Sequence, residues 1–178
     1  MSGDTPSPAI SERVETPASP LVREAASRSV TSDGPRYEHS VRVTFCQTNA
    51  EGNMSHDEYA RLFGVVRELM GLDLIPGFKE EAGRRYLLKT KNASYQYRRD
   101  FYFGDTVQVR MGVAEVTGAS FTMQAEFVNA ACGDIHAVGR QQIVYADMEG
   151  HPRRLPKELK ELLMMMLNGN GNGRGREQ

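Results

Sequence analysis

The chain has 178 residues, a formal net charge of −1 and two cysteines, which suits one folded domain with tails. A near-neutral net charge without a cluster of basic residues argues against nucleic-acid binding as the main function. Cys46 and Cys132 form no C-x-x-C pair and are too few for a disulfide framework, which favours a reducing compartment. Because the sequence has no apolar run of about 18 residues and no signal peptide, we expect a cytoplasmic protein without a membrane partner.

Composition divides the chain into a body and two tails. Residues 1–35 are rich in Pro, Ser, Thr and charged residues and show no hydrophobic periodicity. This composition predicts a disordered leader or, alternatively, a docking arm for a partner protein. Residues 169–178 predict a flexible tail, since its glycines lack the preceding strand and following helix of a phosphate loop. We expect residues 36–168 to fold without either tail.

Five strands and a final helix are predicted from hydrophobic periodicity. Alternation from Tyr37 to Cys46 predicts a strand with Val41, Val43 and Phe45 facing inward. A loop rich in breakers covers residues 72–84. Four further strands joined by short turns imply an antiparallel meander over residues 85–98, 106–116, 120–130 and 135–147. Residues 155–167 are predicted to form a short amphipathic helix.

The stretch from Thr48 to Gly71 holds the one long helix, predicted over residues 56–70 and roughly 22 Å long. Ser55 and Glu58 have the spacing of a capping box at its start. Gly71 stands where a left-handed C-terminal cap is expected. One apolar stripe at three- and four-residue spacing faces the core and comprises Tyr59, Leu62, Phe63, Val66, Leu69 and Met70.

A single helix cannot cover both faces of such a sheet. We therefore predict an α+β fold in which a strongly curved sheet wraps around the helix. Uncovered edges and one uncovered face remain, and these predict a homodimer or a homotetramer.

This arrangement resembles the hotdog fold, and its central stretch resembles the 4-hydroxybenzoyl-CoA-type thioesterases, which commonly read aspartate, two residues, glycine, then a helical tyrosine. Here the pattern is Asn49-Ala50-Glu51-Gly52 and then Tyr59, with asparagine where the aspartate would stand. A base or nucleophile role is therefore not carried over to Asn49.

Thioesterases associated with enediyne polyketide synthases are a narrower resemblance. They read roughly E-T-N-x-x-G-N, a tyrosine, then R-E late in the helix. This chain has Thr48-Asn49-x-x-Gly52-Asn53, Tyr59 and Arg67-Glu68. The similarity covers about residues 37–163 and also includes Tyr37-Glu38-His39, Gly139-Arg140-Gln141 and Leu155-Pro156.

The resemblance implies a cofactor-independent thioesterase. Its substrate would be a β-keto polyketide or polyene chain on an acyl carrier protein or coenzyme A, and the released β-keto acid would lose carbon dioxide to give a methyl ketone. A general acyl-CoA thioesterase is an alternative. A hotdog dehydratase that uses His56 with Asp57, or an acyl-binding subunit without catalysis, also stays open.

Thioester hydrolysis develops negative charge on the carbonyl oxygen, so the site needs preorganised donors. Asn49 offers a neutral NH₂ donor, and the backbone from Gly52 to Ser55 lies at the positive end of the predicted helix. We assign Asn49 a catalytic role and expect Gly52, Asn53 and His56 to contact the substrate. His56 is the nearest titratable candidate, with surface capping as its alternative role.

Arg67 is the second predicted catalytic residue. It flanks the apolar stripe, whereas Glu68 points roughly opposite and is expected in solvent. A surface or interface ion pair is the alternative for Arg67, and core packing is the alternative for the predicted substrate contact Tyr59.

Other chemistry has weaker support. His39, His136 and His151 lack ligand spacing, so we expect no metal site. No G-x-S-x-G elbow indicates a serine hydrolase. Arginines at strand ends are candidate contacts for a phosphopantetheine phosphate or a carrier surface, and they are Arg84, Arg85, Arg98 and Arg99.

Overall fold

The computed structural model describes residues 30–31 and 34–168. The predicted leader and tail therefore lie outside the described residues, apart from a short antiparallel pair of β1 (Val30–Thr31) with β2 (Gly34–Pro35). The body contains, in chain order, β3 (Tyr37–Arg42), η1 (Phe45–Gln47), α1 (His56–Leu74), α2 (Phe78–Glu81), β4 (Leu87–Tyr97), β5 (Thr106–Val116), β6 (Ser120–Asn129), β7 (Ile135–Ala146) and α3 (Lys157–Asn168).

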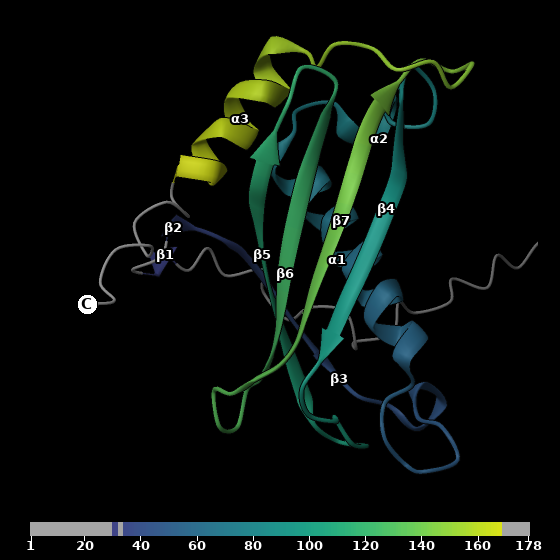
Figure 1. Cartoon of the computed structure of the whole chain (residues 1–178), viewed down its shortest axis with the longest axis vertical. Helices are drawn as coiled ribbons and strands as arrows, with labels where there is room; N and C mark the ends of the chain where they lie inside the picture. The colour runs from purple at the N-terminus through teal and green to yellow at the C-terminus, as the bar shows by residue number, and fades with distance from the viewer. Residues whose placement is uncertain (1–29, 32–33, 169–178) are drawn as a thin grey trace, which may run out of the picture.

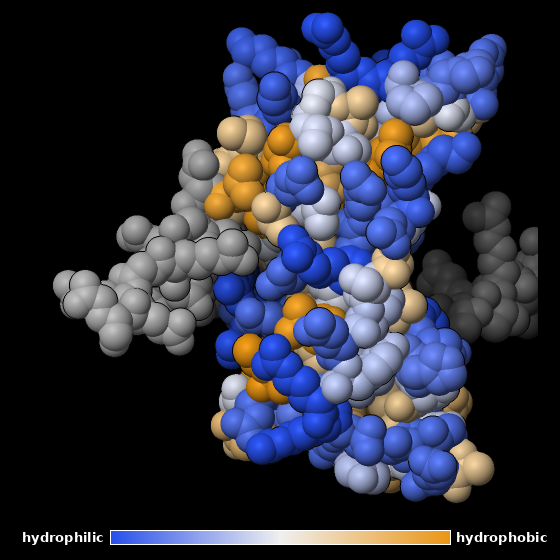
Figure 2. Space-filling model, viewed as in Figure 1, coloured by the Kyte–Doolittle hydropathy of each residue, from blue (hydrophilic) through white to orange (hydrophobic). Residues whose placement is uncertain are grey.

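The five long strands form one antiparallel sheet in the order β3-β5-β6-β7-β4. Figure 1 shows α1 lying behind this sheet and α3 beside β5, so the predicted α+β hotdog arrangement is confirmed. The opposite face of the sheet is largely hydrophilic in Figure 2. The core lies between α1 and the sheet, and its largest fully buried side chains are Phe63, Phe101, Phe127, Met111, Met123 and Ile143.

The first predicted strand is too long at its C-terminal end. It ends at Arg42, and the chain then winds into the 3-10 helix η1. The Gln47 side chain causes this change, because its Oε1 accepts from both the N–H and the hydroxyl of Thr44, at 2.9 and 2.8 Å. Phe45 was predicted to face inward but is 79% exposed, with its ring edge-on to Phe103.

The predicted end of the central helix is also wrong. Gly71 is buried inside α1, which continues to Leu74. A Cβ atom at Gly71 would lie 2.7 Å from the Phe78 ring, so glycine is needed there for close packing. Phe78 belongs to α2, a helical turn within the predicted loop, and that turn is what the sequence pattern missed.

β4 is an edge strand of eleven residues, and most of its residues are exposed. It pairs with β7 on one side, with a register shift between Thr90 and Asn92. The other side has no partner strand among the described residues. No helix in the described part of the chain is long and apolar enough to span a membrane.

Candidate active site

The turn before α1 is held by its own backbone. The Asn49 N–H donates to the Asn53 carbonyl oxygen at 2.9 Å, and the Gly52 N–H donates to the Asn49 carbonyl oxygen at 3.0 Å. Gly52 has a φ of 84°, which glycine adopts without steric cost. The Asn49 Oδ1 accepts from the Glu51 N–H at 2.9 Å, so the side chain is fixed in an Asx turn. Its NH₂ group makes no hydrogen bond to the described residues and lies in an exposed position.

Neighbouring segments hold this turn against the body. The Met54 N–H donates to the Phe101 carbonyl oxygen at 2.7 Å, and the Ser55 N–H donates to the Gln47 carbonyl oxygen at 2.9 Å. The buried Oδ1 of Asn53 has no hydrogen-bond partner within the described ranges. The Asn49 donor is therefore presented from a fixed backbone, which keeps its orientation before any substrate arrives.

The predicted capping box does not form. The Ser55 side chain does not cap the helix but donates to the Asp57 carboxylate. Glu58 instead accepts from Gln47 at 2.9 Å and from Arg61 at 2.7 Å. The Ser55 hydroxyl, followed by the backbone N–H groups of Asp57 and Glu58, lowers the pKa of Asp57. A carboxylate of the chain itself thus occupies the positive end of α1, where an oxyanion was expected.

Tyr59 and His56 have different surroundings on the first two turns of α1. Tyr59 is 2% exposed, with Tyr97 and Phe127 edge-on to its ring at centroid distances of 5.0 and 5.2 Å. Burial, followed by Asp100 and Tyr97, raises its pKa to about 12, so its hydroxyl is neutral at physiological pH. His56 is exposed, and its carbonyl oxygen accepts from the Tyr97 hydroxyl at 3.3 Å. Their substrate contacts stay predictions.

Arg67 lies in a polar network between α1 and the edge of the sheet. Its Nη1 donates to the Thr90 Oγ1 at 2.9 Å and to the Gln141 Oε1 at 3.0 Å. Gln141 is 6% exposed, and its Nε2 donates to the Tyr95 hydroxyl at 2.8 Å. Burial lowers the pKa of Arg67, and the nearby Glu68 opposes that shift. In the described part of the chain, no carboxylate lies within ion-pair distance of this half-buried guanidinium.

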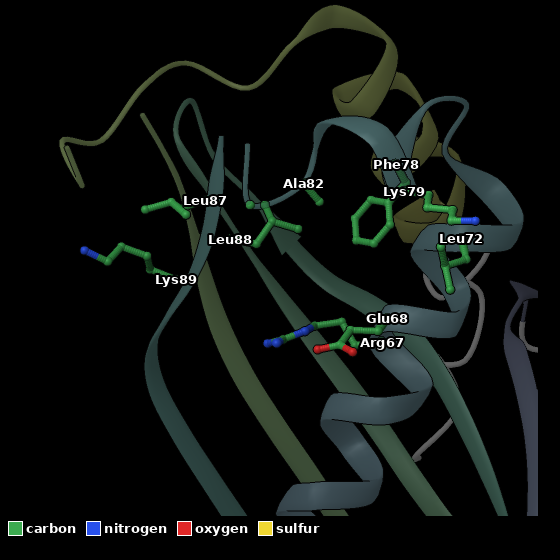
Figure 3. Close-up of a pocket in the computed structure, with 10 residues that line it drawn as sticks. Arg67, Glu68, Leu72, Phe78, Lys79, Ala82, Leu87, Leu88 and Lys89 are labelled. Carbon is green, nitrogen blue, oxygen red and sulfur yellow. The ribbon is translucent and has the colours of Figure 1, made fainter. Parts of the chain in front are cut away.

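A cavity of about 590 Å³ opens beside Arg67 (Figure 3). The Arg67 side chain extends from α1 toward β4, whereas the ammonium groups of Lys79 and Lys89 point away from the middle of the cavity. Glu68, expected in solvent, is exposed but also lines this space. The remaining wall is mostly apolar and comprises Leu72, Phe78, Ala82, Gly83, Leu87 and Leu88.

The two predicted catalytic residues do not meet within one chain. Asn49 precedes the N-terminus of α1, and Arg67 lies about three turns, or about 16 Å of rise, beyond His56. The turn from Asn49 to Asn53 is closed by its own hydrogen bonds, His56 is the first residue of α1, and Tyr59 is buried in the core. Arg67 belongs to the cavity at the other half of the helix.

The predicted carrier contacts also fall into two groups. Arg84 and Arg85 precede β4, and Arg98 and Arg99 follow it, so β4 separates the two groups by roughly 36 Å. All four are exposed. Arg99 is paired with Asp134, and Arg85 donates to Glu81 at 3.1 Å. A single phosphate cannot contact both groups of one chain.

One set of potential metal ligands lies close together in the described residues. Asp147, Glu149 and His151 have ligand atoms within 4.8 Å of one another in an exposed turn. Asp147 already accepts from Arg153 at 2.8 Å and from the N–H groups of Glu149 and His151. The donor set therefore serves the turn itself.

Sequence reasoning did not assign roles to the partners of Arg67. Gln141 alternates with Gly139 and Ile143 on the buried side of β7, and a polar residue in that series is a signal for an inward polar contact. Gly139 is needed because a Cβ atom there would lie 2.7 Å from the Tyr95 ring. Thr90 carries no comparable signal, since hydroxyls are common on exposed edge strands.

Comparisons with known proteins support the family and the fold. The profile of the thioesterase-like superfamily matches residues 43–163. The structure of the dynemicin (enediyne) thioesterase, described with bound polyene, is 28% identical with a TM-score of 0.69, over 74% of this chain and 96% of that one. A search of curated proteins finds no significant match.

Two further structures share the fold at lower identity. A gentisyl-coenzyme A thioesterase is 20% identical with a TM-score of 0.63, over 71% of this chain and 98% of that one. A Staphylococcus aureus protein solved in complex with CoA is 13% identical with a TM-score of 0.72, over 84% and 94%. The family match supports thioester hydrolysis. The chain belongs to the thioesterase-like superfamily, and its fold is that of the hotdog thioesterases.

Proposed function

We propose that this protein hydrolyses an acyl thioester carried by an acyl carrier protein or coenzyme A, with a β-keto polyketide or polyene chain as its substrate. The observation that carries the proposal is the Asn49 side chain, whose Oδ1 is held by the Glu51 N–H while its NH₂ group stays available. An amide fixed in this way donates a hydrogen bond but has no titratable group near neutral pH. Asn49 then stabilises the developing oxyanion or orients the attacking water.

The separation of Asn49 from Arg67 supports a site shared between two copies of the chain. One side of β4 has no partner among the described strands, and antiparallel pairing of two β4 strands about their middle would set Leu87 of one copy opposite Tyr97 of the other. The Tyr97 hydroxyl donates a hydrogen bond to the carbonyl oxygen of His56, the first residue of α1, whereas Leu87 lines the cavity beside Arg67. This pairing would bring the Asn49 turn of one copy toward the Arg67 cavity of the other. We therefore propose a homo-oligomer whose basic unit is this dimer.

Arg67 suits a substrate with a second oxygen function. Only its Nη1 is used by Thr90 and Gln141, so further guanidinium donors are available for a keto oxygen or carboxylate. The apolar cavity wall would hold the hydrocarbon chain. A β-keto group also makes the thioester more electrophilic, which lessens the need for a strong base. Hydrolysis adds water across the C–S bond to give a thiol and a β-keto acid, and this acid then loses carbon dioxide to give a methyl ketone.

A substrate panel tests this function. Rates of thiol release are compared for β-keto and saturated acyl groups of equal length, each on coenzyme A and on a carrier protein. We expect preference for the β-keto acyl group and carbon dioxide release after hydrolysis. Equal rates for both acyl groups on coenzyme A would instead indicate a general acyl-CoA thioesterase. No thiol release from any substrate would leave an acyl-binding subunit, and water elimination from a β-hydroxyacyl thioester would indicate a dehydratase.

The shared site has its own test by mixing two inactive variants, Asn49→Ala and Arg67→Ala. A mixed dimer contains one site with both residues intact if the residues come from different copies. Random assortment makes half of the dimers mixed, so the activity should recover to about one quarter of wild type. If both residues act within one chain, every mixed dimer stays inactive. A monomer in sedimentation at micromolar concentration would also reject the proposal.

A further inference from the structure

A second cavity, of about 240 Å³, lies where the end of α1, α2, β7 and α3 meet. It shares no lining residue with the Arg67 cavity. Its apolar lining comes from the end of α1, the segment after it and the start of α3, and comprises Leu74, Ile75, Pro76, Pro156, Leu159 and Leu162.

Two tyrosines form the aromatic part of this second cavity. The rings of Tyr86 and Tyr145 have their centroids 5.0 Å apart and are inclined by 31° to each other, so they form a tilted pair. Burial, followed by Tyr145 and Glu81, raises the pKa of Tyr86, and burial followed by Glu81 raises that of Tyr145. Both hydroxyls are therefore neutral at physiological pH, and their ring faces offer the negative potential that attracts cations.

The charges that line the second cavity are negative. Glu81 and Glu158 both contribute to its wall, and no lysine or arginine of the described residues does. Glu81 uses Oε1 to accept from Arg85, an exposed residue outside the lining, at 3.1 Å. Glu158 forms no ion pair with any cation in the described ranges, whereas its neighbour Lys157 lies 3.9 Å from Glu161. Glu158 is exposed and the Glu81 side chain is 42% exposed, so the lining combines two solvent-accessible carboxylates with two aromatic rings and apolar side chains.

We propose that this second cavity binds an organic ammonium ion with a short apolar chain. The carboxylates of Glu81 and Glu158 attract the charged head, the ring of Tyr86 or Tyr145 contacts it through a cation–π interaction, and the leucine and proline side chains cover the chain. An anion is disfavoured by the two carboxylates. A neutral molecule of the same shape would gain only the apolar contact. This site is independent of the hydrolytic function proposed above.

Three probes of equal chain length test the assignment on the full chain: hexylammonium, hexanol and hexanoate. Binding is measured by calorimetry, and ring contacts are measured by intermolecular NOEs to labelled tyrosines. We expect hexylammonium to bind about tenfold tighter than hexanol, which corresponds to about 1.4 kcal/mol. Hexanoate should not bind, and NOEs should connect the hexylammonium methylene protons to Tyr86 and Tyr145.

A charge-matched pair of double variants locates the site. Glu81→Gln with Glu158→Gln removes both cavity charges. This double variant should bind hexylammonium about tenfold more weakly and hexanol with unchanged affinity. Glu80→Gln with Glu161→Gln removes two exposed charges from the same helices, outside the cavity. This double variant should change the affinity for neither hexylammonium nor hexanol. Equal affinity for hexylammonium and hexanol would overturn the proposal, as would full binding by the first double variant. If that variant does not fold, absence of the tyrosine NOEs in the wild type rejects the site.

Discussion

The two halves of α1 present opposite environments to a ligand. Just before its N-terminal end, Asn49 offers a neutral donor in solvent, and the first turn of the helix carries the exposed carboxylate of Asp57. In its other half, Arg67 holds a cation partly out of water beside an apolar cavity. A reaction that needs both groups finds only half of its site at either end. The helix therefore separates the groups that one chain supplies, and this separation is the strongest argument for a shared site.

The two ends also differ in what they cost the fold. A solvated amide that keeps its hydrogen bond to water adds little unfavourable free energy. A half-buried guanidinium without a carboxylate partner in the described chain loses solvation, and the hydrogen bonds to Thr90 and Gln141 offset part of that loss. Substitutions at the N-terminal end should thus affect activity with little effect on stability, whereas those in the other half should affect both.

The largest expected effect is at Asn49. Asn49→Ala removes the fixed NH₂ donor and should lower kcat by about 10²–10³, or roughly 3–4 kcal/mol, with little change in Tm. Asn49→Asp should also lower kcat, because it places a negative charge beside the developing oxyanion. Glu51→Gln is the matched control in the same turn, since its backbone N–H still holds Asn49. Full activity of Asn49→Asp would show base catalysis instead.

Arg67→Lys tests the other half of the helix. A lysine keeps the charge but loses the planar fork, so kcat/KM should fall about 10- to 100-fold if one charged hydrogen bond of about 1.5–3 kcal/mol is lost. Steady-state kinetics on the preferred β-keto substrate give this value. The control is Lys89→Gln, which removes a cation whose ammonium group points away from the cavity. An equal loss in both variants would assign the effect to the general positive potential.

Two glycines of α1 separate packing from helix propensity. A Cβ atom at Gly71 would lie 2.7 Å from the Phe78 ring, so Gly71→Ala should lower the free energy of unfolding by about 1–2 kcal/mol. A Cβ atom at Gly64 would meet no atom of the described chain within 4 Å, and Gly64→Ala should raise that free energy by about 0.5–1 kcal/mol. Urea unfolding measures both. Stabilisation by Gly71→Ala would mean that α2 is not firmly packed on α1.

Tyr59 gives the smallest effect, and only at alkaline pH. Its pKa is raised from 10.0 to about 12, so the stability gained by its neutral form is present below pH 10 and is lost as the pH rises through 12. Phenylalanine has no hydroxyl to ionise. On raising the pH to 11, the free energy of unfolding should therefore fall by about 1 kcal/mol more for the wild type than for Tyr59→Phe. Its activity at neutral pH should change less than about threefold if Tyr59 only packs in the core. A larger fall at constant Tm would assign the hydroxyl to the substrate.

Periodicity predicted the strands and the helix because each has one buried side, as the alternating core of β5 and β6 illustrates. It failed where a side chain redirected the backbone. Gln47 bonds back to Thr44 where the chain turns, and Gly71 lies within the helix because the Phe78 ring packs where a side chain would be. Both contacts depend on tertiary structure, so local patterns cannot reveal them.

The site was predictable only in part for a similar reason. The turn around Asn49 follows from adjacent residues, whereas the surroundings of Arg67 depend on Thr90 and Gln141, which are far away in the sequence. Helical spacing placed Arg67 beside the apolar stripe and near the end of the predicted helix, well separated from Asn49, but it did not reveal the cavity beside Arg67. That separation, not the identity of either residue, is what points to a second copy of the chain.

The carboxylate of Asp57 at the start of α1 bears on how turnover ends. Under the proposed function the thioester arrives uncharged at its reacting carbon and leaves as a carboxylate. The carboxylate in the first turn of α1 therefore repels the product more than the substrate and favours its departure. Inhibition by added acid should be severalfold tighter in Asp57→Asn, and the difference should shrink at high salt because exposed charges are screened. Equal inhibition constants at low salt would show that release is governed elsewhere.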